Sequence, residues 1–320
     1  MSKQDQIKKL KECLMLGVDA LERGDMEAYK NYLPPLLPER HPTKDFFVCD
    51  ILDAAPKDDL GSMEHPMFSL STKPDRRIRH YEHNGNSITI APGAHGLATI
   101  WDKDVLIYCI SQVVEALNRG REDVSKTIWV TAHDLLVATN RGTDGRGYQQ
   151  LKAALERLRG TSITTDIESN GLRIKEGFGM IDRWKIVEAG KDERMIAIEI
   201  TLSEWLYNAI KGKDVLTISR DYFRLRKGLE RRLYELARKH CGRQPKWKIS
   251  LELLRKKTGS TAPLKKFRMN IKQIAGSDHL PDYRLVYVEE KDQAIFYTRG
   301  VAGQQEQIRE VLQGGQQRLI

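Results

Sequence analysis

One order of predicted elements occurs twice in this sequence. Between residues 102 and 167 a helical run (102–117) precedes a short strand (127–130), a short helix (133–138), a polar turn (140–147), a helix (148–159) and a β segment (161–167). The order recurs as helix 221–240, strand 246–250, helix 251–257, turn 258–262, helix 263–275 and a β-hairpin over 283–298. This order is typical of the winged helix-turn-helix, whose helix after the turn enters a DNA major groove.

The duplication predicts an α+β fold of two tandem winged-helix domains, preceded by an N-terminal helical arm. We expect the arm over residues 1–64, the first domain over 65–212, the second, strongly basic domain over 213–300, and a flexible tail over 301–320. A hairpin is expected over 78–90, and segments 180–188 and 195–201 are expected to enlarge the antiparallel sheet of the first domain. Residues 3–32 have the leucine spacing of an amphipathic helix, 33–76 look mostly extended, and Ser203 is expected to cap a helix over 203–211.

The positive charge of the chain is concentrated in one stretch. Residues 220–275 contain 18 Lys and Arg against 4 acidic residues, a net charge of +14, whereas the whole chain carries +9. A one-sign stretch on a folded pattern is typical of a protein that binds a polyanion. No apolar run approaches the roughly 20 residues of a membrane span, and the four cysteines form no metal-binding pattern. We therefore expect a cytoplasmic protein with nucleic acid as its partner, no membrane contact and no cofactor.

The predicted helix 263–275 is the better candidate for reading DNA. Its apolar positions, Leu264, Phe267, Ile271, Ile274 and Ala275, fall on one side at 100° per residue. The other side and its flanks contain residues that suit bases or phosphates: Lys265, Lys266, Arg268, Met269, Asn270, Lys272 and Gln273. The alternative is an ordinary solvent-exposed face, although such faces normally include glutamate and this helix has none.

The corresponding helix of the first domain is less basic. Its outward positions, preceded by an arginine in the glycine-rich turn, give the candidate contacts Arg146, Gln149, Gln150, Lys152, Ala153 and Arg157. An interface with a protein partner is the alternative for this helix. Further basic residues at helix starts, strands and the hairpin are candidate phosphate contacts: Arg220, Arg224, Lys246, Lys248, Arg284 and Lys291.

The sequence contains no recognisable catalytic constellation. A phosphate-binding P-loop needs a GxxxxGK[ST] pattern, and none is present. Tyr148 and Lys152 match the Tyr-x-x-x-Lys of DNA-nicking enzymes, but the metal-binding histidine pair of those enzymes is missing, since His80 and His83 have the wrong spacing. We therefore expect a binding protein rather than an enzyme, with a rolling-circle nickase as the enzyme alternative.

Three blocks of sequence resemble the plasmid replication initiator protein A family. They are TAHDLLVATN at 131–140, GRGYQQLKAALERLRGT at 145–161 and TISRDYFRLRKGLERRLYELARKH at 217–240, and the resemblance extends over about residues 65–298. It implies an initiator of theta-type replication that binds repeated sites (iterons) at a plasmid origin, promotes opening of the adjacent DNA and recruits the host initiator and helicase. It also implies a homodimer in equilibrium with monomer, copy control and repression of the protein's own gene. A winged-helix transcriptional repressor without an initiator role remains the main alternative, and a third alternative makes the first domain an assembly module.

Overall fold

The computed structural model describes residues 36–41, 55–83, 86–122, 124–169, 172–189 and 194–316. The amphipathic helix expected over 3–32 lies outside these residues, and so do Asn84 and Gly85 of the expected hairpin turn. No helix in the described part of the chain has the length and apolar character that crossing a membrane requires.

The first predicted unit is present as a helical layer against a three-stranded sheet. It comprises α4 (Lys103–Asn118), β4 (Thr127–Thr131), α5 (Ala132–Ala138), α6 (Gly145–Gly160), β7 (Ile181–Ala189) and β8 (Arg194–Leu202). The sheet has the strand order β4-β8-β7 and is antiparallel throughout. Helix α7 (Glu204–Lys211) follows, and the Ser203 side chain caps it as expected by accepting a hydrogen bond from the Leu206 amide.

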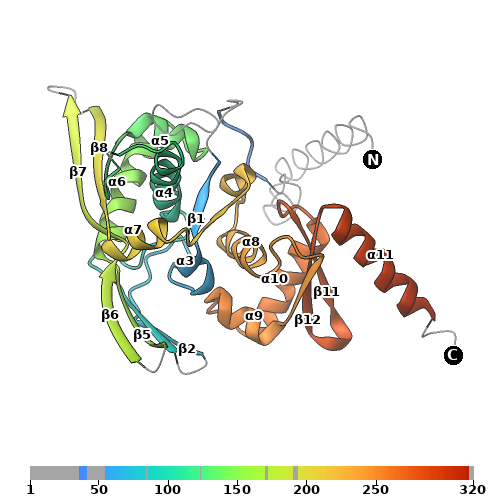
Figure 1. Ribbon diagram of the computed structural model, residues 1–320. Helices are drawn as coiled ribbons and strands as arrows, with labels where there is room; N and C mark the ends of the chain where they lie inside the picture. The colour runs from blue at the N-terminus through green and yellow to red at the C-terminus, as the bar shows by residue number, and fades with distance from the viewer. Residues whose placement is uncertain are drawn as a thin grey trace, which may run out of the picture.

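The second unit repeats this arrangement. It comprises α8 (Gly228–His240), β10 (Lys246–Ser250), α9 (Leu251–Thr258), α10 (Leu264–Ser277), β11 (Tyr283–Val288) and β12 (Gln293–Thr298). Its sheet has the strand order β10-β12-β11, which is the same order as in the first unit. The duplicated order is therefore confirmed from the first helix to the helix after the turn, but the counterpart of the β11–β12 hairpin is β7–β8 and not the predicted segment 161–167. Figure 1 shows the two units side by side.

The expectation of one enlarged sheet in the first unit is wrong. Strand β5 (Ser162–Ser169) does not join β7 and β8 but pairs with β6 (Leu172–Gly179), a strand that the sequence analysis missed. The other edge of β5 pairs with β3 (Asn86–Ala91) of the predicted hairpin, which in turn pairs with β2 (Arg79–His83). Because both edges of β5 are occupied in this way, β2-β3-β5-β6 form a separate four-stranded antiparallel sheet.

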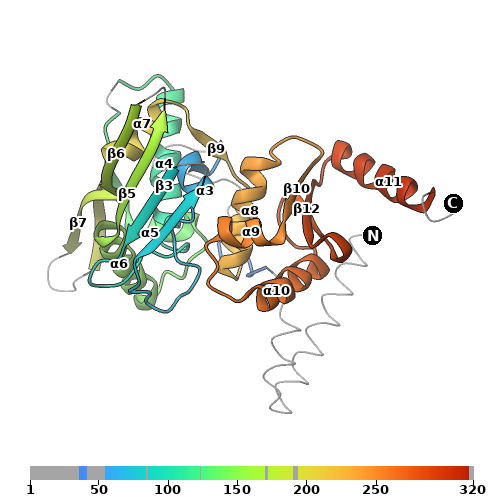
Figure 2. The ribbon, with the colours of Figure 1, turned by 90° about the horizontal axis from the view of Figure 1, so that it is seen from below.

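Two helix predictions also need correction. The single helix expected over 221–240 is divided into the 3-10 turn η2 (Arg220–Arg224) and α8, because the Glu230 carboxylate accepts from the Lys227 amide and so begins a new helix there. The segment expected to be a loose tail contains helix α11 (Val301–Gln316), which projects from the second unit in Figures 1 and 2. Ion pairs from Glu306 and Glu310 to Lys246 on β10 attach this helix to the sheet.

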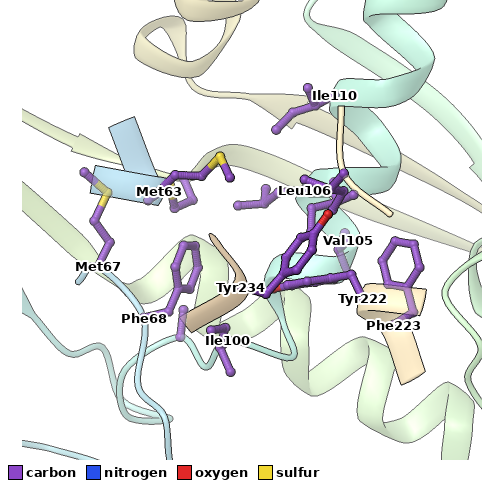
Figure 3. Packing of buried hydrophobic residues seen from close by; sticks show 14 of the residues in the cluster. Met63, Met67, Phe68, Ile100, Val105, Leu106, Ile110, Tyr222, Phe223 and Tyr234 are labelled. Atoms are coloured by element: carbon purple, nitrogen blue, oxygen red, sulfur yellow. The ribbon is translucent and has the colours of Figure 1, made fainter. Parts of the chain in front are cut away.

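The two units share a hydrophobic core. Val105 and Leu106 of α4 lie beside Tyr222 and Phe223 of η2 and Tyr234 of α8, as Figure 3 shows, and all five are buried. Strand β1 (Lys57–Asp59) pairs with β9 (Val215–Thr217), and α3 (Leu60–Glu64) packs on α8. Residues before the first unit, expected to form an extended arm, thus include a strand and a helix that join the units.

Candidate nucleic-acid interface

Helix α10 presents the polar face that its sequence predicts. Phe267, Ile271 and Ile274 are buried against the second unit. The candidate readers Lys265, Lys266, Met269, Lys272 and Gln273 are all exposed, and Arg268 and Asn270 are half-buried on the flanks. Met269, with 55% of its surface accessible, is an unusual apolar side chain to leave in water. The helix therefore offers a contiguous polar face with one apolar contact point, as a base-reading helix requires.

Two cations of α10 are held by the turn of the adjacent hairpin. Arg268 donates from Nε and Nη2 to both carboxylate oxygens of Asp292, at 2.8 and 2.7 Å, and these bonds raise the pKa of Arg268. Lys272 lies 2.7 Å from Glu289 in η3 (Glu289–Lys291) and above the Tyr287 ring. These pairs fix the hairpin against the helix. Among the described residues, Lys265, Lys266, Asn270 and Gln273 have no hydrogen-bond or ion-pair partner, so they are the candidate readers that remain available.

Helix α6 begins three residues earlier than predicted, at Gly145. The Asp144 carboxylate caps it by accepting from the Gly147 amide at 3.0 Å. Gly147 is required here because a Cβ would lie only 1.8 Å from the carbonyl oxygen of Gly142. The early start places Arg146 in the first helical turn, where it is exposed. Gln149, Gln150 and Lys152 are exposed too, and Ala153 is half-buried.

The environment predicted for Arg157 is wrong. The sequence placed this side chain outward on α6, but its Nε and Nη2 donate to the two carboxylate oxygens of Asp102, each at 2.7 Å. The side chain is 22% exposed, and the bonds to Asp102 raise its pKa. Because the guanidinium is already bound in this way, it holds α6 against the start of α4 instead of projecting into solvent.

Several predicted phosphate contacts are also engaged within the chain. Lys246 and Lys248 both bind Glu310 of α11, at 2.6 and 2.7 Å. Burial alone would raise the pKa of Glu310, but bonds from Lys246, Lys248 and Tyr297 lower it to about 2. On the hairpin, Arg284 pairs with Asp278 at 3.0 Å. Arg220 and Lys291 are exposed.

Arg224 holds a segment that runs between the units. Its Nε donates to the Leu37 carbonyl at 2.9 Å, and its own carbonyl accepts from the Leu37 amide at 2.7 Å. The same segment then reaches the turn before α6, where the Arg40 amide donates to Asn140 at 2.7 Å. Arg224 is therefore a residue that joins the units, which differs from the phosphate contact that the sequence predicts.

The sequence analysis missed a set of buried charges where the units meet. Lys103, at the start of α4, is fully buried and lies 2.7 Å from Asp58 on β1 and 3.1 Å from Glu235 on α8. Arg231 of α8 lies 2.6 Å from Asp104 of α4, and both are about 2–3% exposed. Burial raises the pKa of Asp58 despite the ammonium of Lys103 beside it. The basic character of residues 220–275 therefore arises in part from residues that join the units.

The fold is similar to that of two solved structures of RctB. Domains 2 and 3 of RctB match with a TM-score of 0.56 and 11% identity, covering 76% of this chain and 99% of that chain. A second structure of the same two domains, RctB residues 155–483, gives a TM-score of 0.53 and 13% identity, covering 76% of this chain and 98% of that one. At these identities the likeness concerns the fold: a mixed α+β architecture with antiparallel sheets.

Sequence comparison identifies the family. The family model of replication initiator protein A matches residues 57–285. A relative from Wigglesworthia glossinidia brevipalpis, named "Putative replication protein", is 45% identical over 259 residues, which are 80% of this chain and 94% of the relative. The chain belongs to the replication initiator protein A family, as the three sequence blocks predicted, and its role is that of a replication initiator.

Proposed function

We propose that this chain is a plasmid replication initiator that binds duplex DNA through two winged-helix units. Helix α10 reads one major groove and supplies most of the specificity, while α6 contacts a neighbouring groove. Binding to repeated origin sites would place the protein for opening the adjacent DNA and for recruiting the host initiator and helicase. The proposal involves no catalytic step, and it includes repression of the protein's own gene and a monomer–dimer equilibrium.

The exposed face of α10 is the observation that carries this proposal. Lys265, Lys266 and Gln273 are exposed and unpaired within the described residues, on a helix whose other face is fixed by buried Phe267 and Ile271. Cations left free by the fold suit phosphates, and an amide suits adenine. In Figure 2, α6 and α10 lie along the same edge of the molecule, which supports contact with one face of a duplex. Successive grooves on one face are about 10.5 base pairs apart, so one chain would cover roughly 20 base pairs.

The first experiment is selection from a random duplex pool, followed by footprinting of the selected sequence. An asymmetric site of about two helical turns supports the proposal. A palindrome would instead favour the rival function of a dimeric transcriptional repressor, and a footprint over a single groove would make the first unit an assembly module. A plasmid bearing the cognate origin then separates initiator from repressor, because only an initiator maintains it.

Variants on α10 test the roles of single residues. Gln273→Ala should relax preference at one base position by about 1–3 kcal/mol. Lys265→Ala should weaken binding to all DNA sequences alike and reduce the slope of log K against log salt by about 0.9. Lys185→Ala, an exposed lysine on β7, is the matched control. If all three variants behave alike, the assignment of the α10 face is wrong. A covalent tyrosine–DNA adduct formed with a divalent metal would instead support the nickase alternative.

A further inference from the structure

A cleft of about 370 Å³ lies between the first unit and the DNA-reading part of the second. One wall is the segment from Ser69 to Arg79, which leads into β2 of the first unit. The opposite wall is the turn between α9 and α10, with Ser260 and Thr261, and continues along α10 to Asn270 and Gln273. The cleft therefore joins part of the first unit to two of the predicted base readers of the second.

Arg79 is an incompletely bonded cation in this cleft. Its side chain is only 10% exposed. Nη2 donates to Asp75 at 2.8 Å and to Ser69 at 3.3 Å, but Nε and Nη1 have no hydrogen-bond partner in the described part of the chain. Buried guanidinium groups are normally bonded through all their N–H groups, because an unpaired one loses its hydration without compensation. Arg79 thus has two buried donors that lack an acceptor.

The charges around Arg79 favour an anion. Arg77 and Lys227 also line the cleft, and Asp75 is the carboxylate among them. Arg77 bonds Asp75 through Nε and Nη2, at 2.9 and 2.8 Å, and with Arg79 it holds the pKa of Asp75 far below its usual range. Asp75 is therefore a fully ionised, doubly paired group. Lys227 is paired with Glu230 at 3.6 Å, so Arg77 and Arg79 against Asp75 leave the cleft with a net charge of +1.

The N-terminus of α8 opens on the same cleft. Lys227, Gly228 and Leu229 line it, and α8 is 13 residues long, so its dipole places partial positive charge there, of which the capping Glu230 carboxylate offsets a part. Gly228 is required for this position because a Cβ would lie 2.5 Å from the carbonyl oxygen of Leu70. The absence of a side chain lets the helix end approach the first unit closely. Helix end and Arg79 thus converge from different units.

We propose that Arg79, the N-terminus of α8 and the Ser260–Thr261 turn form a phosphate-binding site, and that its occupant is a backbone phosphate of the DNA strand beside α10. This inference rests on the proposed function. Asn270 and Gln273 line the same cleft, so a phosphate held here would fix the register of the helix against its bases. Through Arg79, the first unit would thus help to position α10 of the second unit on its DNA bases.

The test combines a protein variant with single neutral phosphates in the DNA. The full chain and Arg79→Gln are titrated with the selected duplex, in which one phosphate at a time is replaced by a methylphosphonate. Arg76→Ala, an exposed arginine of the same segment that does not line the cleft, is the control. We expect Arg79→Gln to weaken binding about 10- to 100-fold, as loss of a charged hydrogen-bonded pair does. At one position, a methylphosphonate should weaken DNA binding by the wild type but not by Arg79→Gln, because in the variant that phosphate has already lost its partner.

The following outcomes decide the inference. If every methylphosphonate weakens Arg79→Gln as much as the wild type, no single phosphate is bound by Arg79 and the inference is wrong. If inorganic phosphate binds the wild type but not Arg79→Gln, as measured by calorimetry, and no position is coupled, the occupant is free phosphate and not DNA. Arg79→Lys, which keeps the charge, should retain part of the coupling even if Arg79→Gln folds poorly. If the wild type selects no duplex at all, the proposed function fails, whereas selective binding that ignores Arg79 overturns this inference alone.

Discussion

Substitution of Lys103 by methionine tests whether buried charges join the two units. The ammonium is fully buried, 2.7 Å from Asp58 Oδ2 and 3.1 Å from Glu235 Oε1, and it lies over the Phe68 ring at 5.6 Å. Lys103 belongs to α4 of the first unit and Glu235 to α8 of the second. Methionine keeps most of the apolar stem and removes the ammonium with its hydrogen bond to Asp58, so the variant measures the contribution of the charged group.

The expected loss follows from what each carboxylate retains. Breaking a buried ion pair by removing one partner typically costs about 3–5 kcal/mol. Glu235 keeps Arg232 at 3.0 Å and so remains paired. Asp58 loses its cation, but its pKa is already raised to about 8, so it can take up a proton instead of staying charged. We therefore expect about 3 kcal/mol at pH 6 and a larger loss at pH 9, where keeping Asp58 protonated costs more.

Urea unfolding of the full chain, followed by circular dichroism at pH 6 and pH 9, measures this loss. Lys103→Met with Asp58→Asn should recover part of the stability at pH 9, because the asparagine leaves no charge to bury. Lys185→Met on the exposed face of β7 is the control and should lie within about 0.5 kcal/mol of wild type. If Lys103→Met is as stable as this control at both pH values, the ionic network does not join the units in solution.

Three further predictions follow from single contacts. Asp58→Asn removes a carboxyl group whose pKa is raised from 3.8 to about 8, and its contribution to stability is complete below pH 4 and lost as the pH rises through 8. The wild type should therefore lose unfolding free energy relative to this variant between pH 4 and 8, and parallel urea profiles would contradict this. Gly147→Ala forces a Cβ to within 1.8 Å of the Gly142 carbonyl oxygen and should cost at least about 1–3 kcal/mol in urea unfolding, whereas Gly145→Ala has nothing within 4 Å and should cost little. Glu310→Gln removes the carboxylate that binds Lys246 on β10, so DNA affinity should rise and its salt dependence should steepen; an unchanged salt slope would place β10 away from DNA.

The helical part of the candidate interface could be predicted because it depends on local periodicity. Phe267, Ile271 and Ile274 recur at helical spacing, and this spacing alone separates the buried face of α10 from its polar face. Local sequence patterns also located α9, which ends one residue later than predicted, and the strand β10, whose bounds match the prediction. The four-stranded sheet β2-β3-β5-β6 was harder to predict from the sequence, because the pairing of β5 with β3 joins residues such as Ile163 and Ile90 that are far apart in the chain. Strand order is not encoded in the alternation of any single strand.

The partners of charged residues could not be predicted for a related reason. Arg231 and Arg232 lie on an amphipathic helix among other basic residues, and in sequence they resemble solvent-exposed cations. Arg231 pairs with Asp104, 127 positions earlier, and Arg232 donates to the carbonyl of Ser62. A cation has the same appearance in sequence whether its partner is a phosphate or a carboxylate in another unit. The structure shows which cations of the basic stretch are already neutralised.

Under the proposed function, this division of the cations would explain how a chain with so much positive charge binds DNA selectively. Arg231 pairs with Asp104 of the first unit and Arg232 with Glu235 of α8 itself, so these cations contribute little to long-range attraction for phosphates, because their charge is compensated at close range. Lys265 and Lys266 remain uncompensated on the helix that also carries Gln273. Under the proposed function, affinity and base readout would therefore be concentrated on one helix face. The buried pairs between the units, in turn, hold α6 and α10 at a fixed separation. A variant with a weakened interface between the units should therefore first tolerate altered spacing between the two DNA half-sites, before it loses affinity for either half-site.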